Sequence, residues 1–138
     1  MRRSWINFQS WIRSLFNRNK ASDVVAVKGG GSYAVIGVPT LHAILEERPG
    51  TFLLVNTHIP FEGDIPGTDL SVPYNRIEEN LSKFPVDKHA EIVLYCMKDV
   101  TSRTAAKRMV TAGYDNIKIL DGGFIAWQDA GFPLLVGH

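Results

Sequence analysis

From residue 33 onward, short apolar runs alternate with stretches in which apolar residues recur every three or four positions. The short runs predict buried strands over residues 33–36, 52–56, 92–95 and 116–120. A weaker run over 24–27 predicts a further strand. The helical spacing predicts helices over 39–47, 76–83, 102–112 and 124–130. Alternating strands and helices favour an α/β fold, in which helices flank a central, mainly parallel sheet of about five strands.

Residues at the borders of these segments predict where the helices begin and end. Asn75, Ser102 and Asp121 each stand at an expected N-cap, because their side chains accept a backbone N–H of the first turn. Gly113 suits the position after a helix C-terminus, since glycine readily adopts the left-handed conformation there. The proline- and glycine-rich stretch 57–74 predicts a long irregular loop.

Residues 4–17 have the pattern of an extra, N-terminal amphipathic helix. Large apolar side chains fall on one arc of the helical wheel: Trp5, Phe8, Trp11, Ile12, Leu15 and Phe16. Residues 1–20 hold five basic residues and no acidic one, which leaves −4 for the rest of a chain whose net charge is +1. Such a helix suits an anionic membrane interface. Packing on its own domain, on a second copy or on a partner is an equal alternative.

Gly29-Gly30-Gly31 interrupts the chain between these two regions. A triple glycine forms a flexible linker or a sharp turn. It lacks the spacing of a phosphate-binding loop, so we give it a structural role. The sequence therefore divides into the amphipathic helix (1–20), a glycine-rich linker (21–32) and one α/β domain (33–138).

Composition narrows the chemistry. The chain contains a single cysteine, which excludes an internal disulfide, and its four histidines show no metal-ligand spacing. We therefore expect no metal and no organic cofactor. The body of the chain has no basic surplus, so nucleic acid is not an expected partner. No apolar run approaches the roughly 18 residues of a membrane span, and residues 1–20 lack the features of a secretory signal. We expect a cytoplasmic protein, with the membrane surface as the alternative site for residues 1–20.

The cysteine, Cys96, lies at the end of the run 92–95 and six residues before Ser102. In an α/β protein this order places a side chain at the carboxyl edge of the sheet, beside a helix N-terminus. Unpartnered N–H groups and the helix dipole favour an anion there, so the thiolate form of a cysteine gains stability. The alternative is a small buried hydrophobic residue with no reactive role. Position alone leaves both open.

The chain resembles the rhodanese (sulfurtransferase) family over about residues 36–135. In the second half, Cys96 enters a short loop, Ser102-Arg-Thr-Ala-Ala106 follows, and residues 117–127 match the family pattern V-x-x-L-x-G-G-x-x-x-W, with isoleucine in first place. In the first half, Leu53-Leu-Val-Asn56 stands where the family has a strand ending in D-x-R. Residues 63–68 stand where it has G-H-I-P-G-A. The resemblance implies a rhodanese-like three-layer sandwich.

The resemblance also implies a chemistry for Cys96. The family cysteine takes a sulfane sulfur from a small donor, thiosulfate or a persulfide, and passes it to a thiol or cyanide-like acceptor through a covalent persulfide. The substrate-binding loop would be Met97, Lys98, Asp99, Val100, Thr101 and Ser102. Its backbone N–H groups would stabilise the anion, and Lys98 would favour the thiolate. Asn56, His58 and Arg103 would lie at the border of the site.

Several positions depart from the family pattern. Thr101 stands where the active loop commonly has an arginine, and Asp99 stands where it has a glycine. The carboxylate of Asp99 would add a negative charge near a site meant for thiosulfate, which Lys98 could offset. Arg103 is two residues too far along to replace that arginine. Asn56-Thr57-His58 replaces D-x-R, and Asp64 replaces the family histidine. Without a bidentate arginine clamp, a donor of low charge should suit the site at least as well as thiosulfate.

Two functions remain. The first is a sulfurtransferase that works through a persulfide on Cys96. The second is a catalytically silent rhodanese-like binding or regulatory module, anchored by its N-terminal helix. The retained cysteine favours the first and the missing arginine favours the second. A phosphatase is disfavoured, because such enzymes close the loop on a tetrahedral oxyanion with an arginine.

Overall fold

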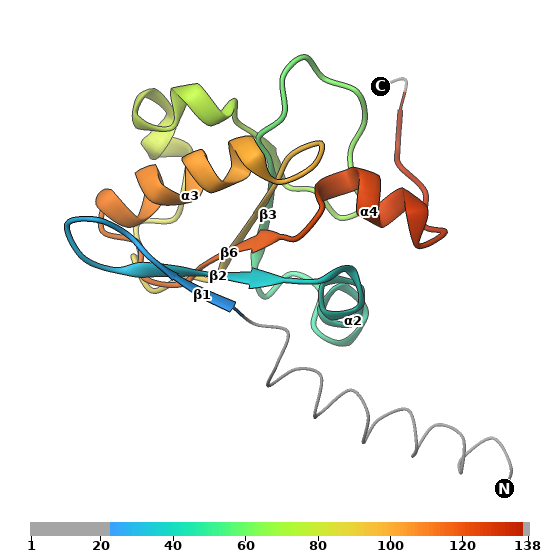
Figure 1. Ribbon diagram of the computed structural model, residues 1–138, viewed down its shortest axis with the longest axis horizontal. Coiled ribbons are helices and arrows are strands. Elements are labelled where there is room, and N and C mark those ends of the chain that lie inside the picture. Colours follow the sequence, from blue (N-terminus) through green and yellow to red (C-terminus); the bar gives the residue numbers. More distant parts are fainter. Residues whose placement is uncertain (1–22, 137–138) are drawn as a thin grey trace, which may run out of the picture.

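In the computed structural model, residues 23–136 are described, and they build one sheet of six strands (Figure 1). The strands are β1 (Asp23–Ala26), β2 (Ser32–Ile36), β3 (Leu53–Asn56), β4 (Leu70–Ser71), β5 (Ile92–Tyr95) and β6 (Ile117–Leu120). Their order across the sheet is β1-β2-β6-β5-β3-β4. β1 runs antiparallel to β2, and every other pair is parallel. The predicted α/β class and the mainly parallel sheet are confirmed.

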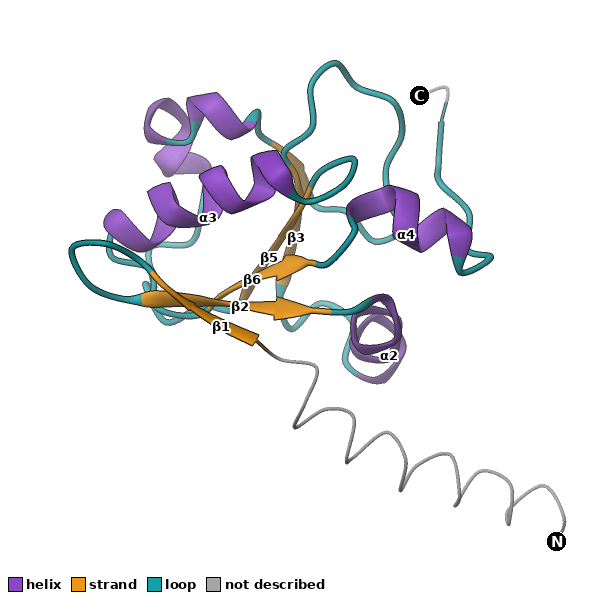
Figure 2. Ribbon diagram, viewed as in Figure 1, coloured by secondary structure: helices purple, strands orange, loops and turns teal. Residues whose placement is uncertain are grey.

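Helices cover both faces of this sheet, as Figure 2 shows. The helices are α2 (Val38–Glu47), α3 (Val100–Thr111) and α4 (Gly123–Asp129), with two 3₁₀ segments, η1 (Tyr74–Arg76) and η2 (Glu78–Lys83). Buried residues of α3 and the 3₁₀ region share one core cluster, and those of α2 and α4 share the other. The structure is therefore a three-layer sandwich.

The central strand β5 shows how the sequence builds two cores. Ile92 and Leu94 belong to the α3 cluster, while Val93 and Tyr95 belong to the α2 and α4 cluster. Successive side chains of a strand point to opposite faces, so a strand covered on both sides must be apolar throughout. All four residues are fully buried. This continuous apolar run made β5 predictable from the sequence.

The segment for which we expected a glycine-rich linker belongs, from Asp23 onward, to the sheet. β1 pairs with β2 in register from Asp23 opposite Val35 to Ala26 opposite Ser32. The three glycines lie in the hairpin turn, where all of them have positive φ angles. Glycine adopts such angles without steric cost, so it favours a sharp turn here. The expected helix over residues 4–17 lies outside the described residues.

Three helix boundaries differ from expectation. Residues 76–83, expected as one helix capped by Asn75, form two 3₁₀ segments, and Asn80 inside η2 has a non-helical conformation. Helix α3 begins at Val100 rather than at Ser102. Helix α4 has Gly122, not Asp121, at its N-cap, in the left-handed conformation.

The structure also differs from expectation in the loop predicted over residues 57–74. This loop contains the two-residue strand β4, which extends the sheet beyond β3 through the pairs Val55–Leu70 and Asn56–Ser71. A strand of two residues has no detectable periodicity, so the sequence could not reveal it. No helix within residues 23–136 is long and apolar enough to cross a membrane.

Candidate functional site

Cys96 lies where strand β5 ends, at the carboxyl edge of the sheet. β5 is an inner strand, with β6 on one side and β3 on the other, and all three run parallel. Their carboxyl ends therefore meet at one edge, where open α/β sheets bind ligands. The Cys96 residue is 2% exposed, so the sulfur lies at the bottom of the loop that follows.

The loop between β5 and α3 is shorter than expected, because the helix begins two residues early. Asp99 occupies the N-cap position, and its carbonyl accepts the first helical hydrogen bond, from Arg103 N at 3.0 Å. The carbonyl also accepts a bond from Ser102 Oγ at 3.0 Å. We had expected Ser102 at the N-cap, and this expectation was wrong. Ser102 is fully buried and lies in the first turn, together with Val100 and Thr101.

One backbone donor of this first turn meets the sulfur. The N–H of Ser102 donates to Cys96 Sγ, with nitrogen and sulfur 3.4 Å apart. N–H groups of a first helical turn have no acceptor inside the helix. The sulfur therefore takes the place that an anion takes at a helix N-terminus. The sequence had predicted this juxtaposition of Cys96 and Ser102.

The start of α4 holds the other side of the loop. Phe124 N donates to the carbonyl of Cys96 at 2.9 Å, and Ile125 N donates to that of Met97 at 3.0 Å. In a trans peptide the N–H points opposite to the C=O. The N–H groups of Met97 and Lys98 therefore point away from α4. Figure 1 shows the chain leaving β5 and entering α3 beside the start of α4.

Gly123 makes this close approach feasible. Its φ is +59°, and a Cβ there would overlap the backbone carbonyl oxygens of Cys96, Met97 and Lys98. Only glycine avoids both the left-handed strain and the overlap. The sequence pattern contained this glycine, but nothing in it indicated that the residue contacts the loop. A pair of glycines directly before a helix was the available signal.

Asp99 is turned away from the sulfur and toward α4. Its Oδ2 accepts a hydrogen bond from Gly122 N at 3.3 Å, and its Oδ1 lies 3.7 Å from Arg103 Nε. The pKa of Arg103 is raised by a hydrogen bond with Tyr33 and, against some desolvation, by the charge of Asp99. Asp99 and Arg103 thus neutralise each other beside the loop. We had expected Asp99 as an added negative charge at the site.

The remaining residues of the expected loop differ in exposure, and Val100 and Thr101 belong to the first turn of α3. Met97 and Thr101 are partly buried, whereas Lys98 and Val100 are exposed. Thr101 lies directly before the residue whose N–H reaches the sulfur. Across the part of the chain that the structure describes, no group of three histidine, cysteine, aspartate or glutamate residues is placed to hold a metal.

Asn56 is the last residue of β3, and His58 lies two residues after it. Asn56 Nδ2 donates to the carbonyl of Gly63 at 3.0 Å and to Asp64 Oδ1 at 2.9 Å, and Asn56 Oδ1 accepts the N–H of His58 at 3.0 Å. The His58 ring pairs with Glu62 and meets Phe124 edge-on, with ring centroids 5.4 Å apart. Asn56 therefore orders the 57–64 loop.

Tyr95 joins the same loop to the strand before Cys96. Its buried hydroxyl accepts the N–H of Ile65 at 3.0 Å and lies 2.7 Å from Thr68 Oγ1. Burial raises the pKa of Tyr95 well above its usual value. Thr57 donates to the Tyr95 carbonyl from both its N–H, at 2.8 Å, and its hydroxyl, at 2.9 Å. Nothing in the sequence had indicated a role for Tyr95 or Thr57.

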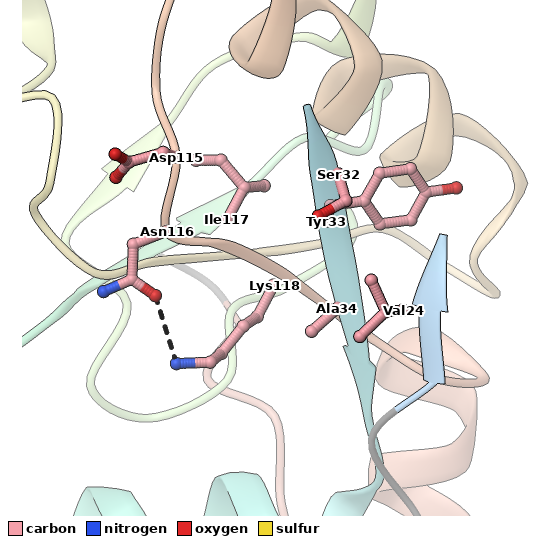
Figure 3. A pocket seen from close by; sticks show the side chains of 8 residues that line it. All are labelled: Val24, Ser32, Tyr33, Ala34, Asp115, Asn116, Ile117 and Lys118. Carbon is pink, nitrogen blue, oxygen red and sulfur yellow. Dashed lines mark hydrogen bonds between the residues drawn. The ribbon is translucent and has the colours of Figure 1, made fainter. Parts of the chain in front are cut away.

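A shallow hollow lies away from this site, at the amino ends of β2 and β6 (Figure 3). The hollow is lined by Val24, Ser32, Tyr33, Ala34, Asp115, Asn116, Ile117 and Lys118. Lys118 Nζ donates there to Asn116 Oδ1 at 3.4 Å. These side chains include no nucleophilic thiol, so the hollow does not compete with Cys96 for the proposed chemistry.

Several known proteins resemble this chain in sequence. The model of the "Rhodanese-like domain" family matches residues 55–130. A sulfurtransferase of Allochromatium vinosum is 34% identical over 86 residues, which cover 60% of this chain and 78% of that protein. The thiosulfate sulfurtransferase GlpE of Shewanella oneidensis is 36% identical over 59 residues, covering 41% of this chain and 58% of that protein.

Solved structures agree on the fold. A rhodanese-related protein from Thermoplasma volcanium superposes with a TM-score of 0.63 at 20% sequence identity, over 75% of this chain and 98% of that one. At this identity the likeness shows the architecture alone. The three-layer sandwich is therefore shared with a protein of that description.

Proposed function

The chain belongs to the rhodanese-like domain family, and from this premise we propose that it is a sulfurtransferase that carries sulfur as a persulfide on Cys96. One observation carries the proposal. The buried Cys96 sulfur accepts the Ser102 N–H at the start of α3, at 3.4 Å. A hydrogen-bond donor that points at this sulfur stabilises negative charge, first on the Cys96 thiolate and then on its persulfide.

The loop backbone would supply further stabilisation. The carbonyl groups of Cys96 and Met97 are engaged by α4, which directs the N–H groups of Met97 and Lys98 to the opposite side of the loop. A sulfane sulfur attached to Cys96 would carry its negative charge near such donors. Because α4 and Asp99 hold the loop in place, the donors are preorganised and need no rearrangement during the reaction.

The reaction proceeds in two displacements. The Cys96 thiolate attacks the outer sulfur of thiosulfate, a new S–S bond forms, and sulfite departs with the electron pair of the old one. The acceptor, cyanide or a thiolate, then attacks the outer sulfur of the persulfide, and the Cys96 thiolate leaves with its electron pair. No proton donor and no external oxidant is required. The covalent intermediate divides one transfer into two easier steps.

The surroundings of the loop favour a donor of low charge over thiosulfate. Thr101 offers no cation, and the guanidinium of Arg103 is engaged with Asp99 and Tyr33. Lys98 is exposed, so water and salt screen its charge. A persulfide donor would depend less on the missing clamp than thiosulfate does.

The test is the rate of thiocyanate formation with cyanide, measured with thiosulfate and with glutathione persulfide as donors. Wild-type protein should turn over both donors, and Cys96→Ser should turn over neither. Equal rates for the two proteins would exclude the Cys96 pathway. Absence of turnover in the wild type would favour the alternative, a catalytically silent module, for which Thr101 in place of the family arginine is the supporting observation.

A further inference from the structure

Exposed apolar side chains gather at the segments that border the Cys96 loop. In the described part of the chain, eight large hydrophobic side chains are exposed, and two of them, Val24 and Val86, lie elsewhere. The other six form a set that we name the apolar rim: Ile59 (42% exposed), Phe61 (47%), Val100 (71%), Ile125 (36%), Leu135 (48%) and Val136 (68%). Such a concentration of apolar surface at one place marks an interaction site.

Chain connections and hydrogen bonds tie the parts of the apolar rim to the loop. Val100 opens α3, and Ile125 donates its N–H to the carbonyl of Met97 at 3.0 Å. The 57–64 loop, which carries Ile59, is joined to β5 by the two hydrogen bonds of Thr57 to the Tyr95 carbonyl. In Figure 1 this loop and the C-terminal tail rise on the same side of the sheet as the start of α4.

The C-terminal tail is fastened to that same loop. Asp64 N donates to the Leu135 carbonyl at 2.9 Å, and Leu135 N donates to the Asp64 carbonyl at 2.7 Å. A Cβ on Gly63 would lie 2.9 Å from Val136 Cγ1, so the two segments are in close contact. The apolar rim therefore lies on four segments, the 57–64 loop, the start of α3, α4 and the C-terminal tail, that the chain itself or backbone hydrogen bonds connect.

Charge and size limit what this surface can bind. Glu62, whose side chain is 49% exposed, lies directly after Phe61 of the apolar rim, and an acidic side chain opposes an anionic bilayer. Thiosulfate is too small and too polar to use such a border. What docks there must also present a sulfur atom to Cys96, which is 2% exposed. A projecting polypeptide segment with apolar residues beside its cysteine meets all these conditions.

Building on the proposed function, we infer that the apolar rim docks a partner protein that exchanges the sulfane sulfur through a cysteine flanked by apolar residues. In the accepting direction, the partner's thiolate attacks the outer sulfur of the Cys96 persulfide. A new S–S bond forms on the partner, and the bond to Cys96 breaks with its electron pair remaining on Cys96. Burial of apolar side chains at the border supplies the specificity.

The experiment compares two capped, uncharged peptides of equal length as acceptors, Leu-Val-Cys-Val-Leu and Ser-Thr-Cys-Thr-Ser. The full-length protein is loaded with sulfur from thiosulfate, and peptide persulfide is followed by mass spectrometry. We expect the apolar peptide to react about tenfold faster. Ile59→Ser and Leu135→Ser should each remove most of that preference without slowing the polar peptide. Val86→Ser, a matched change at an exposed site away from the border, should leave the preference intact.

Equal rates for the two peptides would overturn the inference, as would Ile59→Ser and Leu135→Ser behaving like Val86→Ser. Binding to anionic vesicles, or concentration-dependent dimerisation, that disappears in Leu135→Ser would overturn it too, because a bilayer or a second copy would then occupy the surface. Thiocyanate formation from thiosulfate and cyanide separates the two claims. If that reaction persists while the peptide preference is absent, the docking surface alone is wrong. If it is absent and Cys96 takes up no sulfur, the proposed function itself fails.

Discussion

At the scale of single residues, Thr101 stands where the sequence resemblance leads us to expect an arginine. It lies in the first turn of α3, next to the residue whose N–H is 3.4 Å from Cys96 Sγ. An arginine at this position offers a forked, permanently charged donor to thiosulfate. Its absence explains why we expect low-charge donors to react well here.

Thr101→Arg should therefore lower the KM for thiosulfate by about fivefold or more, the effect of one charge-assisted hydrogen bond. The reaction is followed as thiocyanate formation over a range of thiosulfate concentrations. Thr111→Arg adds the same charge at the far end of α3 and serves as the matched control. A KM that falls equally in both variants would point to a general charge effect and contradict the described loop geometry.

Asp99 shows what single-residue reasoning could not supply. Its position in the loop was evident from the sequence, and we expected its charge to oppose an anionic donor. In the structure its carboxylate binds Gly122 N and pairs with Arg103. Gly122 stands at the N-cap of α4, and Arg103 lies four residues further along the chain. The direction of the Asp99 side chain therefore depends on how α4 docks. The place of Cys96 close to the N-terminus of α3, in contrast, follows from the order of strand, loop and helix along the chain.

At the scale of elements, the contact of α4 with the loop after β5 is central. The N-terminal N–H groups of α4 hold two loop carbonyls, and Gly123 allows the two backbones to meet. The sequence predicted strand β5 from its continuous apolar run, and helices α2 and α4 from apolar residues at helical spacing and from the residues at their borders. It did not predict the 3₁₀ segments or β4, where packing rather than periodicity decides the conformation.

Gly123→Ala should destabilise the protein by about 3 kcal/mol or more, since left-handed strain of about 1–2 kcal/mol is joined by a backbone overlap. Sulfur transfer should fall with it, because the loop must move. Gly131→Ala is the matched control: its φ is +94°, and nothing lies within 4 Å of the added Cβ. That variant should lose only the strain. Urea unfolding of both variants measures the difference, and equal losses would show that α4 does not press on the loop.

At the scale of the whole molecule, an ion-pair cluster holds the end of the sheet opposite the site. Glu91, just before β5, accepts two hydrogen bonds from Arg48, at 2.6 and 3.0 Å, and one from Lys118 Nζ at 2.5 Å. The Glu91 side chain is 12% exposed. The Arg48 hydrogen bond, and then Lys118, hold the pKa of Glu91 below its usual value. No sequence pattern indicated this cluster, because its members come from three distant segments.

The lowered pKa predicts how the stability changes with pH. The stabilisation is fully present above the unfolded-state pKa, about 4.5, and is lost as the pH falls through the lower folded-state value. Glu91→Gln should cost about 1–2 kcal/mol at pH 7, a moderate figure because the cluster is partly solvated. The cost should shrink at about pH 3. Urea unfolding at both pH values measures this cost. The control is Glu79→Gln, which removes an exposed ion pair with Arg76. A cost that is the same at both pH values would show that the charge of Glu91 contributes nothing.

The most direct measurement of the central claim is the intact mass of the protein after incubation with a sulfane donor. Wild-type protein should gain one sulfur atom, cyanide should remove it as thiocyanate, and peptide mapping should find it on Cys96. Cys96→Ser should gain nothing under the same conditions. A wild-type protein whose mass does not change, with thiosulfate or with glutathione persulfide, would contradict the assignment of Cys96 as the sulfur carrier.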